Sequence, residues 1–312
     1  MKMSELQFHA RGKIMITGEY IVLKGADCYA RPTNKTQSLV VQTAHQPGKL
    51  KWISLDHQGK PWFEFTFDWN SPKIQLAISK NPVAKTLSEI LTLNVELNGD
   101  NSIFEKGLQV TTRLEWPQEW GLGSSSTLIA LISQWLNTDP FAVQHEILGG
   151  SGYDIACAIS ESPILYRIVE KSHEIIPLQK NEYFDHHACF VWQGKKASTP
   201  EALRSFRAIE HESLLQSIIK RANQATQELI YGNDPLSMIE AIHEHESAIG
   251  QLINAAPIHQ HQFKDFKGAI KSCGAWGGDF ALFFGKEPAE YTAKWVQKKY
   301  GLTAFSANDL LI

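Results

Sequence analysis

A glycine- and serine-rich loop at residues 121–127 (GLGSSST) is the most unusual stretch of the chain, and a predicted helix at 128–136 follows it. Glycines let the backbone turn with positive φ and approach a ligand closely, and the free N–H groups at a helix start bind anions. The hydroxyls of Ser124, Ser125 and Ser126 add donors, and one of them can reach Mg²⁺. The loop therefore predicts either a polyphosphate site or an ordinary serine N-cap, and spacing alone favours neither.

A second glycine-rich segment at 149–152 (GGSG) precedes a predicted helix at 153–160 and places Asp154 in its first turn. The positive end of the helix dipole favours an ionised carboxylate at that position. Asp154 is therefore a candidate base or orienting group. The alternative is an ordinary acidic residue at a helix start.

Basic and imidazole side chains form two further groups. Lys195 and Lys196 come just before a predicted helix start and suit an anion, although an exposed basic turn explains them as well. His243 and His245 are two residues apart in a predicted helix and so point in different directions, whereas a zinc pair needs a separation of three or four. Surface polarity explains these histidines, and those of the loop at 259–261, better than a metal site.

The 312 residues are 43% hydrophobic and carry 30 basic against 33 acidic side chains, for a net charge of -3. This length predicts about two domains, and the composition excludes a disordered, collagen-like or coiled-coil chain. The charge balance does not suggest a protein that coats nucleic acid. Four scattered cysteines, and the lack of a signal-peptide core or a membrane-length apolar run, predict a cytoplasmic protein with reduced thiols.

Alternating apolar residues predict that the first quarter of the chain is mostly sheet. A helical period at 83–93, entered after Pro82, and a return to alternation at 107–115 follow. The predicted strands of the first quarter lie at residues 13–16, 20–23, 38–42, 50–55 and 62–67.

The second half mixes helices and strands, so the sequence predicts an α+β chain. A predicted hairpin at 163–176 precedes a polar stretch that holds the domain boundary, which gives domains at 1–178 and 179–312. The elements predicted beyond this boundary are a strand at 188–193, helices at 201–231 and 235–254, a strand at 280–284 and a helix at 289–300.

Three motifs resemble those of the GHMP kinases, the family of galactokinase, homoserine kinase, mevalonate kinase and phosphomevalonate kinase. Residues 121–126 (GLGSSS) resemble the central GLGSS[AS] motif, residues 10–23 (ARGKIMITGEYIVL) the N-terminal PGKxxLxGEY/H segment, and residues 271–284 (KSCGAWGGDFALFF) the C-terminal glycine motif. All three occur in the family's order. Two positions depart from the pattern, because Arg11 stands where Pro is usual and Trp276 where Gly is usual. The Walker A and protein-kinase motifs are absent, which excludes those classes.

The resemblance implies a GHMP kinase fold, with an N-terminal domain like ribosomal protein S5 and a C-terminal ferredoxin-like domain. It implies ATP and Mg²⁺ as cofactors, with Asp154 against the attacking hydroxyl and Lys13 stabilising developing charge. Ser125 and Glu146 are the expected Mg²⁺ ligands, and Trp69, Trp116 or Trp120 could flank the adenine. The residues expected at the phosphates are Gly121, Leu122, Gly123, Ser124, Ser125 and Ser126.

The acceptor is expected to be 5-phosphomevalonate, because residues 191–204 (VWQGKKASTPEALR) resemble the WTGxxAST stretch of phosphomevalonate kinases. Mevalonate kinase is the alternative enzyme, and a non-catalytic GHMP-fold protein that binds a metabolite or nucleotide is the alternative outside catalysis. Partners other than small molecules are not expected, neither nucleic acid nor membrane, and the chain is expected to be a monomer or homodimer. The residues expected on the substrate side are Glu19, whose role is to support the site, and Lys195, Lys196, Ser198, Thr199, Gly277 and Gly278.

Overall fold

The structure is a computed structural model that describes residues 5–69, 78, 80–170, 172–194, 212–274, 276 and 279–312. The chain forms two compact units. Unit 1 comprises Met1–Gly12, Lys35–Gln118 and Leu122–Ile159, and unit 2 comprises Lys13–Asn34, Glu119–Gly121 and Ser160–Ile312. Within the described ranges, every helix is too short or too polar to span a lipid bilayer.

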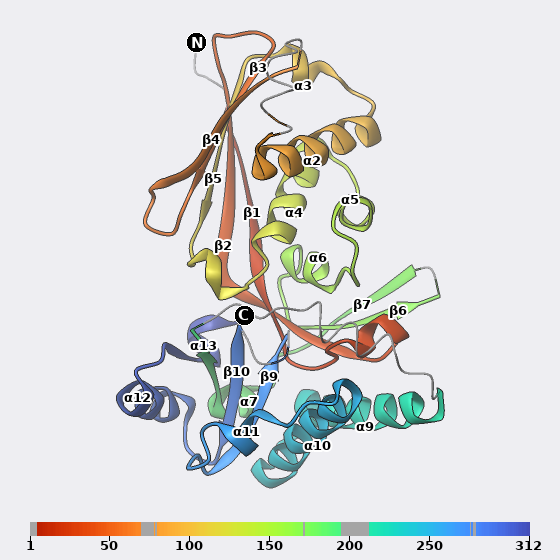
Figure 1. Ribbon diagram of the computed structural model, residues 1–312, viewed down its shortest axis with the longest axis vertical. Helices are drawn as coiled ribbons and strands as arrows, with labels where there is room; N and C mark the ends of the chain where they lie inside the picture. The colour runs from red at the N-terminus through yellow and green to blue at the C-terminus, as the bar shows by residue number, and fades with distance from the viewer. Residues whose placement is uncertain are drawn as a thin grey trace. The chain divides into compact units, whose positions relative to one another are not determined.

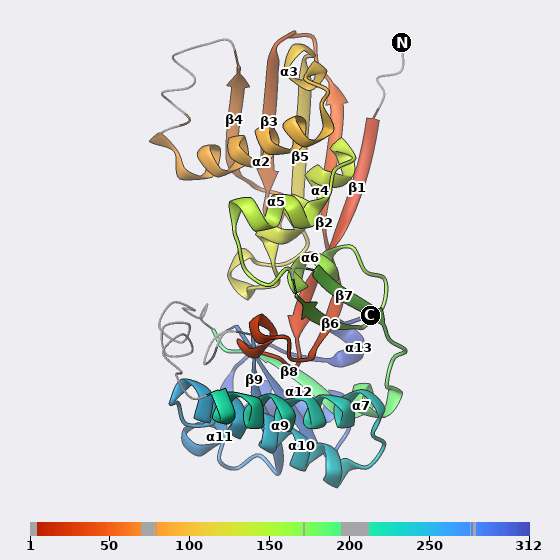
Figure 2. The same cartoon turned by 90° about the vertical axis from the view of Figure 1, so that its right-hand side faces the viewer.

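Unit 1 is built on a sheet with the strand order β4-β3-β5-β2, and β1 also pairs with β2 (Figures 1 and 2). Strands β3 and β5 run parallel, whereas β3 with β4 and β2 with β5 are antiparallel. Alternation of buried and exposed residues along β3 and β5 leaves one face of the sheet apolar. The strands are β1 (Glu5–Met15), β2 (Cys28–Thr43), β3 (Lys49–Leu55), β4 (Pro61–Asp68) and β5 (Leu108–Leu114).

The helices of unit 1 cover that apolar face (Figures 1 and 2). Helix α2 is capped by Asn81, the residue before Pro82, whose side chain accepts hydrogen bonds from the backbone N–H groups of Val83 and Ala84. The helix ends at Gly99, which has the left-handed conformation. Trp52, Leu91 and Ile129 are completely buried in the core between helices and sheet. The helices are α2 (Pro82–Asn98), α3 (Ser102–Glu105), α4 (Ser124–Leu136), α5 (Pro140–Ile147) and α6 (Tyr153–Ala158).

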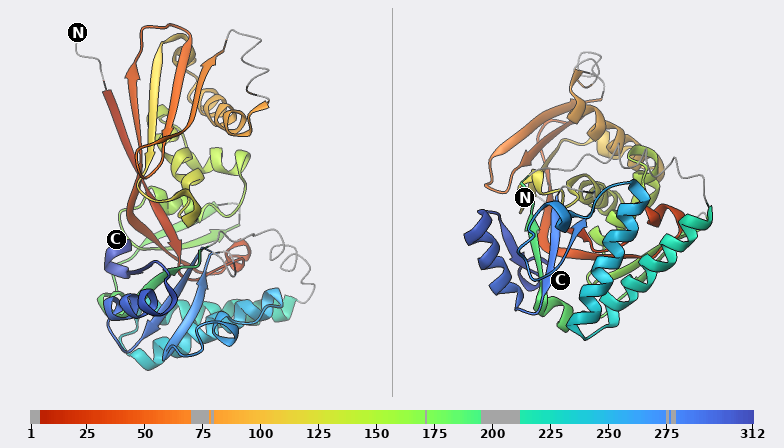
Figure 3. Two further views of the ribbon diagram at one scale, coloured as in Figure 1. Left: turned by 60° about the vertical axis from the view of Figure 1, so that its left-hand side comes forward. Right: turned by 60° about the horizontal axis from the view of Figure 1, so that its bottom comes forward.

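Unit 2 contains an antiparallel sheet with the strand order β11-β8-β10-β9. Helices α9 and α10 lie side by side, and α12 packs on β8 and β11 (Figure 3). Residues 28–30 of β2 pair with β6, which forms a hairpin with β7. The strands of unit 2 are β6 (Ile164–Val169), β7 (Ser172–Pro177), β8 (Ala188–Trp192), β9 (Gly268–Cys273), β10 (Phe280–Gly285) and β11 (Ala304–Ser306).

The helical elements of unit 2 include two long helices and several short ones. In α9 the buried residues recur with a helical period, as predicted for this region. The turn η2 (Gln118–Trp120) lies just before the glycine- and serine-rich loop at 121–127. The other elements are η1 (Ile21–Lys24), α7 (Glu182–His187), α9 (Glu212–Tyr231), α10 (Pro235–Ile253), α11 (Ile258–His261), α12 (Ala289–Tyr300) and α13 (Ala307–Leu310).

Two sequence predictions differ from this architecture, and a third is tested only in part. The strand predicted at 20–23 is wrong, since this segment is the 3-10 helix η1, entered through Tyr20 at a φ of 64° and left through Gly25 at 80°. The compact units do not follow the single predicted boundary, because residues 13–34 and 160–178 both belong to unit 2. The helix predicted at 201–231 is helical from Glu212, and residues 201–211 lie outside the described residues.

Candidate functional site

The glycine-serine loop opens helix α4 in the way that an anion-binding loop requires. Gly121 and Gly123 have φ values of 67° and 91°, which only glycine adopts readily. Gly123 is the N-cap, and no side chain caps the helix, so the alternative of an ordinary serine N-cap does not hold. Because α4 starts at Ser124, the three serines occupy its first turn, where backbone N–H groups lack acceptors within the helix.

A cavity of about 330 Å³ lies beside this first turn, entirely within unit 1. Ser124 and Ser125 line one part of it, and aromatic and aliphatic side chains line the rest. Polar donors next to flat apolar walls suit a nucleoside whose phosphates reach the loop. The apolar lining includes Trp52, Trp62, Phe63, Pro82, Val83 and Leu87.

The indoles that line this cavity are not the three that the sequence predicted. Trp116 is completely buried, and Trp69 stacks on Phe67 with their ring centroids 5.3 Å apart. Trp120 packs edge-on against aromatic rings of β10 and β11. Trp52 and Trp62 line the cavity instead. Nine tryptophans are scattered along the chain, so composition could not single out these two.

Asp154 is the second residue of α6, which follows Gly152 at a φ of 85°. Ser126 donates a hydrogen bond from its hydroxyl to Asp154 Oδ2. Gln144 Nε2 lies 3.5 Å from Asp154 Oδ1. The structure thus brings the predicted reaction residue against the first turn of α4, with all three side chains inside unit 1.

The phosphate-loop predictions divide into two groups. Leu122 is 1% exposed, so its side chain belongs to the core and only its backbone can serve a ligand. Ser126 is 3% exposed, and its hydroxyl proton is already donated to Asp154. Ser124 and Ser125 remain at the cavity.

The predicted metal ligands also separate. Glu146 is exposed on α5, whereas Gln144, two residues earlier, is buried and is the α5 side chain that contacts Asp154. Gln144 Oε1 is buried and has no hydrogen-bond partner among the described residues. No group of three His, Cys, Asp or Glu side chains in the described ranges could hold a metal. The oxygen donors present fit Mg²⁺, which takes few protein ligands beside phosphates and water.

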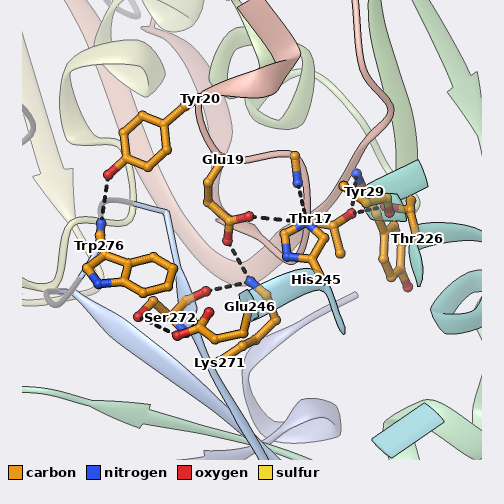
Figure 4. Close-up of polar contacts among 12 residues, drawn as sticks. Thr17, Glu19, Tyr20, Tyr29, Thr226, His245, Glu246, Lys271, Ser272 and Trp276 are labelled. Carbon is orange, nitrogen blue, oxygen red and sulfur yellow. Dashed lines mark hydrogen bonds and ion pairs between the residues drawn. The ribbon is translucent and has the colours of Figure 1, made fainter. Parts of the chain in front are cut away.

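The two predicted residues of the N-terminal motif have different surroundings. Lys13 lies half-buried near the end of β1, within unit 2. Glu19 is 3% exposed, and its Oε1 is 2.6 Å from Lys271 Nζ (Figure 4). This buried ion pair leaves the Glu19 carboxylate turned into the protein.

Glu19 belongs to a buried polar cluster of unit 2 made with His245, Glu246, Lys271 and Ser272 (Figure 4). Gly18 donates its N–H to His245 Nε2 over 3.1 Å, and Glu246 Oε2 accepts the N–H of Ser272 over 3.1 Å. Burial alone would lower the pKa of Lys271, but the facing carboxylates of Glu19 and Glu246 raise it. The sequence analysis assigned His245 to a polar surface, which is wrong, since this side chain is completely buried.

Burial also shifts the pKa values of the two α10 residues in this cluster. Burial raises the pKa of Glu246 from 4.5 to about 7, and the positive charge of Lys271 partly opposes this rise. It lowers the pKa of His245 well below 6.5, and the Lys271 charge acts in the same direction. His245 is therefore neutral near pH 7, while Glu246 is close to its midpoint. The histidine patterning gave no sign of this, although a lysine within the apolar strand β9 signals a paired buried charge.

The departure at Trp276 is accommodated by its neighbours. The backbone N–H of Trp276 donates to the Tyr20 hydroxyl over 3.0 Å (Figure 4). The indole packs on the apolar cluster between η1, α9 and α10.

Asp279, at the end of the glycine motif, lies directly over Gly121. A Cβ added at Gly121 would come within 2.3 Å of Asp279 Oδ2, so a side chain there would displace this carboxylate, and the φ of 67° also favours glycine. Both residues belong to unit 2. The predicted residues Lys195, Lys196, Ser198, Thr199, Gly277 and Gly278 lie outside the described residues.

No protein-family model and no curated protein sequence matches this chain. Solved structures do match it. The mevalonate kinase of Methanococcus jannaschii superposes with a TM-score of 0.72 at 16% identity, over 97% of each chain. The Lin0012 protein of Listeria innocua superposes with a TM-score of 0.71 at 18% identity, also over 97% of each chain.

A Streptococcus pneumoniae phosphomevalonate kinase, in complex with phosphomevalonate and AMPPNP, superposes with a TM-score of 0.67 at 16% identity over 95% of this chain and 97% of that one. Identities this low establish a fold and leave the activity open. The predicted α+β fold is confirmed. Like the mevalonate, phosphomevalonate and galactose kinases among its structural neighbours, the chain has the GHMP kinase fold.

Proposed function

We propose that this protein is an ATP-dependent small-molecule kinase that transfers the γ-phosphoryl group to an oxygen of an isoprenoid-pathway acid, with 5-phosphomevalonate as the acceptor. The observation that carries the proposal is the hydrogen bond from Ser126 to Asp154. It holds a carboxylate at the first turn of α4, the helix whose N-terminal loop is built for an anion. A phosphate site, and a group that orients the attacking oxygen and can take its proton, are what phosphoryl transfer to an acceptor oxygen requires.

Each residue has a defined role in this reaction. Backbone N–H groups at the start of α4 bind the polyphosphate, and the cavity beside Ser124 and Ser125 receives the nucleoside. Asp154 orients the attacking oxygen of the acceptor, a phosphate oxygen in 5-phosphomevalonate and a hydroxyl in mevalonate, and takes its proton where it carries one. The new O–P bond forms as the bond from Pγ to the β-phosphate oxygen breaks. ADP leaves with that oxygen. Lys13 stabilises the charge that develops on the transferring group.

Mg²⁺ would neutralise phosphate charge in such a reaction. The chain offers it the Ser125 hydroxyl and the buried Gln144 Oε1. Glu146 was the second ligand expected from sequence, but it is exposed on α5. Gln144 is therefore the stronger candidate on that helix.

The acceptor assignment rests on the segment at 191–204 and on the structural neighbour that binds phosphomevalonate. Other neighbours with this fold are a galactokinase complexed with galactose and a heptose 1-phosphate kinase. An assay of ADP release with 5-phosphomevalonate, mevalonate, homoserine and galactose separates the candidates. ATP binding without turnover on any acceptor would favour the non-catalytic alternative.

Asp154→Ala tests the proposed mechanism. Loss of a group that moves a proton in the transition state lowers turnover by about 10²-fold or more, whereas ATP affinity changes little. Glu96→Gln, which neutralises an exposed carboxylate on α2, is the matched control and retains wild-type turnover. An Asp154→Ala variant with near-normal turnover would remove this residue from the mechanism.

A further inference from the structure

We propose that Ser126 and Gln144 are positioning residues that hold the two oxygens of the Asp154 carboxylate from two different helices. This inference rests on the proposed function and deepens it. It assigns a role to the Ser126 hydroxyl and to Gln144 Nε2, which contact Asp154 rather than ATP or the acceptor. It also removes Ser126 from the set of phosphate ligands that its motif position predicted.

Ser126 differs from the two serines before it. Ser124 and Ser125 line the cavity at the start of α4, whereas Ser126 faces inward and is 3% exposed. A serine hydroxyl has a single proton to donate, and that proton is directed at Asp154 Oδ2. A phosphate oxygen can only accept a hydrogen bond. Ser126 therefore cannot serve a phosphate while it holds the carboxylate.

Gln144 holds the other oxygen. Its side chain is 5% exposed, and Nε2 lies between the carbonyl of Gly149, at 3.2 Å, and Asp154 Oδ1, at 3.5 Å. Both neighbours are acceptors, so the amide must present its NH₂ group to them. The backbone N–H groups of Leu148 and Gly149 both bond to the Gln144 carbonyl at 2.9 Å, which fixes the residue against the loop before α6.

The backbone around Asp154 explains why two anchors are needed. Helix α6 has only six residues, and Gly149, Gly150 and Gly152 before it have φ values of 66°, 92° and 85°. Glycines restrict the chain least, so this backbone does little to fix the direction of the carboxylate. A proton acceptor that is misplaced by even about 1 Å loses much of its catalytic effect. Donors on both oxygens prevent the carboxylate from rotating.

Ser126→Ala separates positioning from phosphate binding. If Ser126 positions Asp154, the variant lowers kcat by about tenfold or more and leaves the affinity for ATP, measured by calorimetry, unchanged. Ser125→Ala is the matched comparison, since Ser125 lines the cavity and its loss weakens ATP binding. A Ser126→Ala variant with normal kcat, or with weakened ATP binding as its main defect, overturns the assignment.

Gln144 is tested by a variant of similar size. Gln144→Leu removes the amide donor and lowers kcat, with little change in KM for ATP or in ATP affinity. Structural damage alone would lower kcat and ATP affinity together, and that result would overturn the role of Gln144.

A double-mutant cycle checks the contact without any activity. Ser126→Ala and Asp154→Ala should be non-additive in the midpoint of urea unfolding, because each removes the same hydrogen bond, and additive effects would contradict the contact. A wild-type protein that transfers phosphate to none of the acceptors overturns the proposed function. An active wild type whose Ser126 and Gln144 variants keep normal kcat overturns only the inference made here.

Discussion

Gly121 and Gly123 carry the strictest local requirements of the candidate site. Both have positive φ, and a side chain at Gly121 would have to displace the Asp279 carboxylate. A Cβ at either position strains the backbone and moves the N–H groups at the start of α4. The anion site therefore depends on two residues that have no functional group of their own.

Gly123→Val is expected to weaken ATP binding by about tenfold or more, because a branched side chain disfavours a φ of 91° and shifts the loop. Isothermal titration with ATP measures the change. Gly99→Val is the matched control, since Gly99 has a φ of 78° at the end of α2, where an added Cβ meets nothing within 4 Å. Equal ATP affinity in the two variants would place the phosphate site elsewhere.

Trp276 shows how one residue that departs from a motif is tolerated. Its indole packs on the apolar cluster between η1, α9 and α10, and its backbone N–H donates to the Tyr20 hydroxyl. Contacts within unit 2 thus hold the bulky residue in place.

Helix α10 brings the two titrating residues of the buried cluster into unit 2. His245 and Glu246 are adjacent in sequence, and both are buried because α10 is covered by α9, β9 and the N-terminal segment. The charged groups that act on Glu246 are Lys271, which lowers its pKa, and Glu19, which raises it. Stability should therefore respond to pH through this helix.

Glu246→Gln tests that response. The folded protein holds the Glu246 proton up to about pH 7, whereas the unfolded chain releases it near pH 4.5, so this stabilising contribution is complete below 4.5 and is lost as pH rises through 7. The stability of Glu246→Gln relative to wild type should rise across that interval by up to about 3 kcal/mol. Urea unfolding at several pH values measures the difference.

His245 acts in the opposite direction over part of the same range. Because the pKa of His245 is lowered in the folded protein, the unfolded chain binds a proton below about pH 6.5 that the folded protein does not bind. The free energy of unfolding therefore falls as the pH falls. The comparison with wild type cancels this contribution. Glu240→Gln, an exposed change on the same helix, should track wild type at every pH. A Glu246→Gln curve parallel to wild type would contradict the raised pKa.

At the scale of the whole molecule, polar contacts join the N-terminal segment of unit 2 to residues that are far away in sequence. Arg31 Nη1 lies 2.7 Å from Asp185 Oδ1, and Arg31 also donates to the carbonyl of Ile312. The Glu19–Lys271 pair makes a second such link. These contacts explain why residues 13–34 belong to the unit that contains the C-terminal half.

Asp185→Ala should destabilise the protein by about 3–5 kcal/mol, because it leaves the Arg31 guanidinium buried without its carboxylate. Denaturant unfolding measures the loss. Glu244→Ala is the control within unit 2: it removes a half-exposed partner of Arg221 and should change stability by about 1 kcal/mol or less. Similar losses in the two variants would show that the buried pair does not hold unit 2 together.

The sequence alone determined the features that depend on neighbouring residues. Glycines before a helical apolar period predicted the loop and the helix that follows it, and Asp154 was predicted at a helix start. The strands β3, β4 and β5 were predicted within one or two residues of their observed ends. Steric freedom, unpaired helix ends and periodicity act over a few residues, so each can be read along the chain.

Only the tertiary structure decided which of these local features meet. The pairing of Ser126 with Asp154, and of Glu19 with Lys271, joins residues that no local rule connects. Helix α5 has eight residues, too few for a clear period, so the sequence could not show that Gln144 faces inward and Glu146 outward. Such contacts arise from the packing of whole elements, and that packing minimises the free energy of the fold as a whole rather than of any one segment.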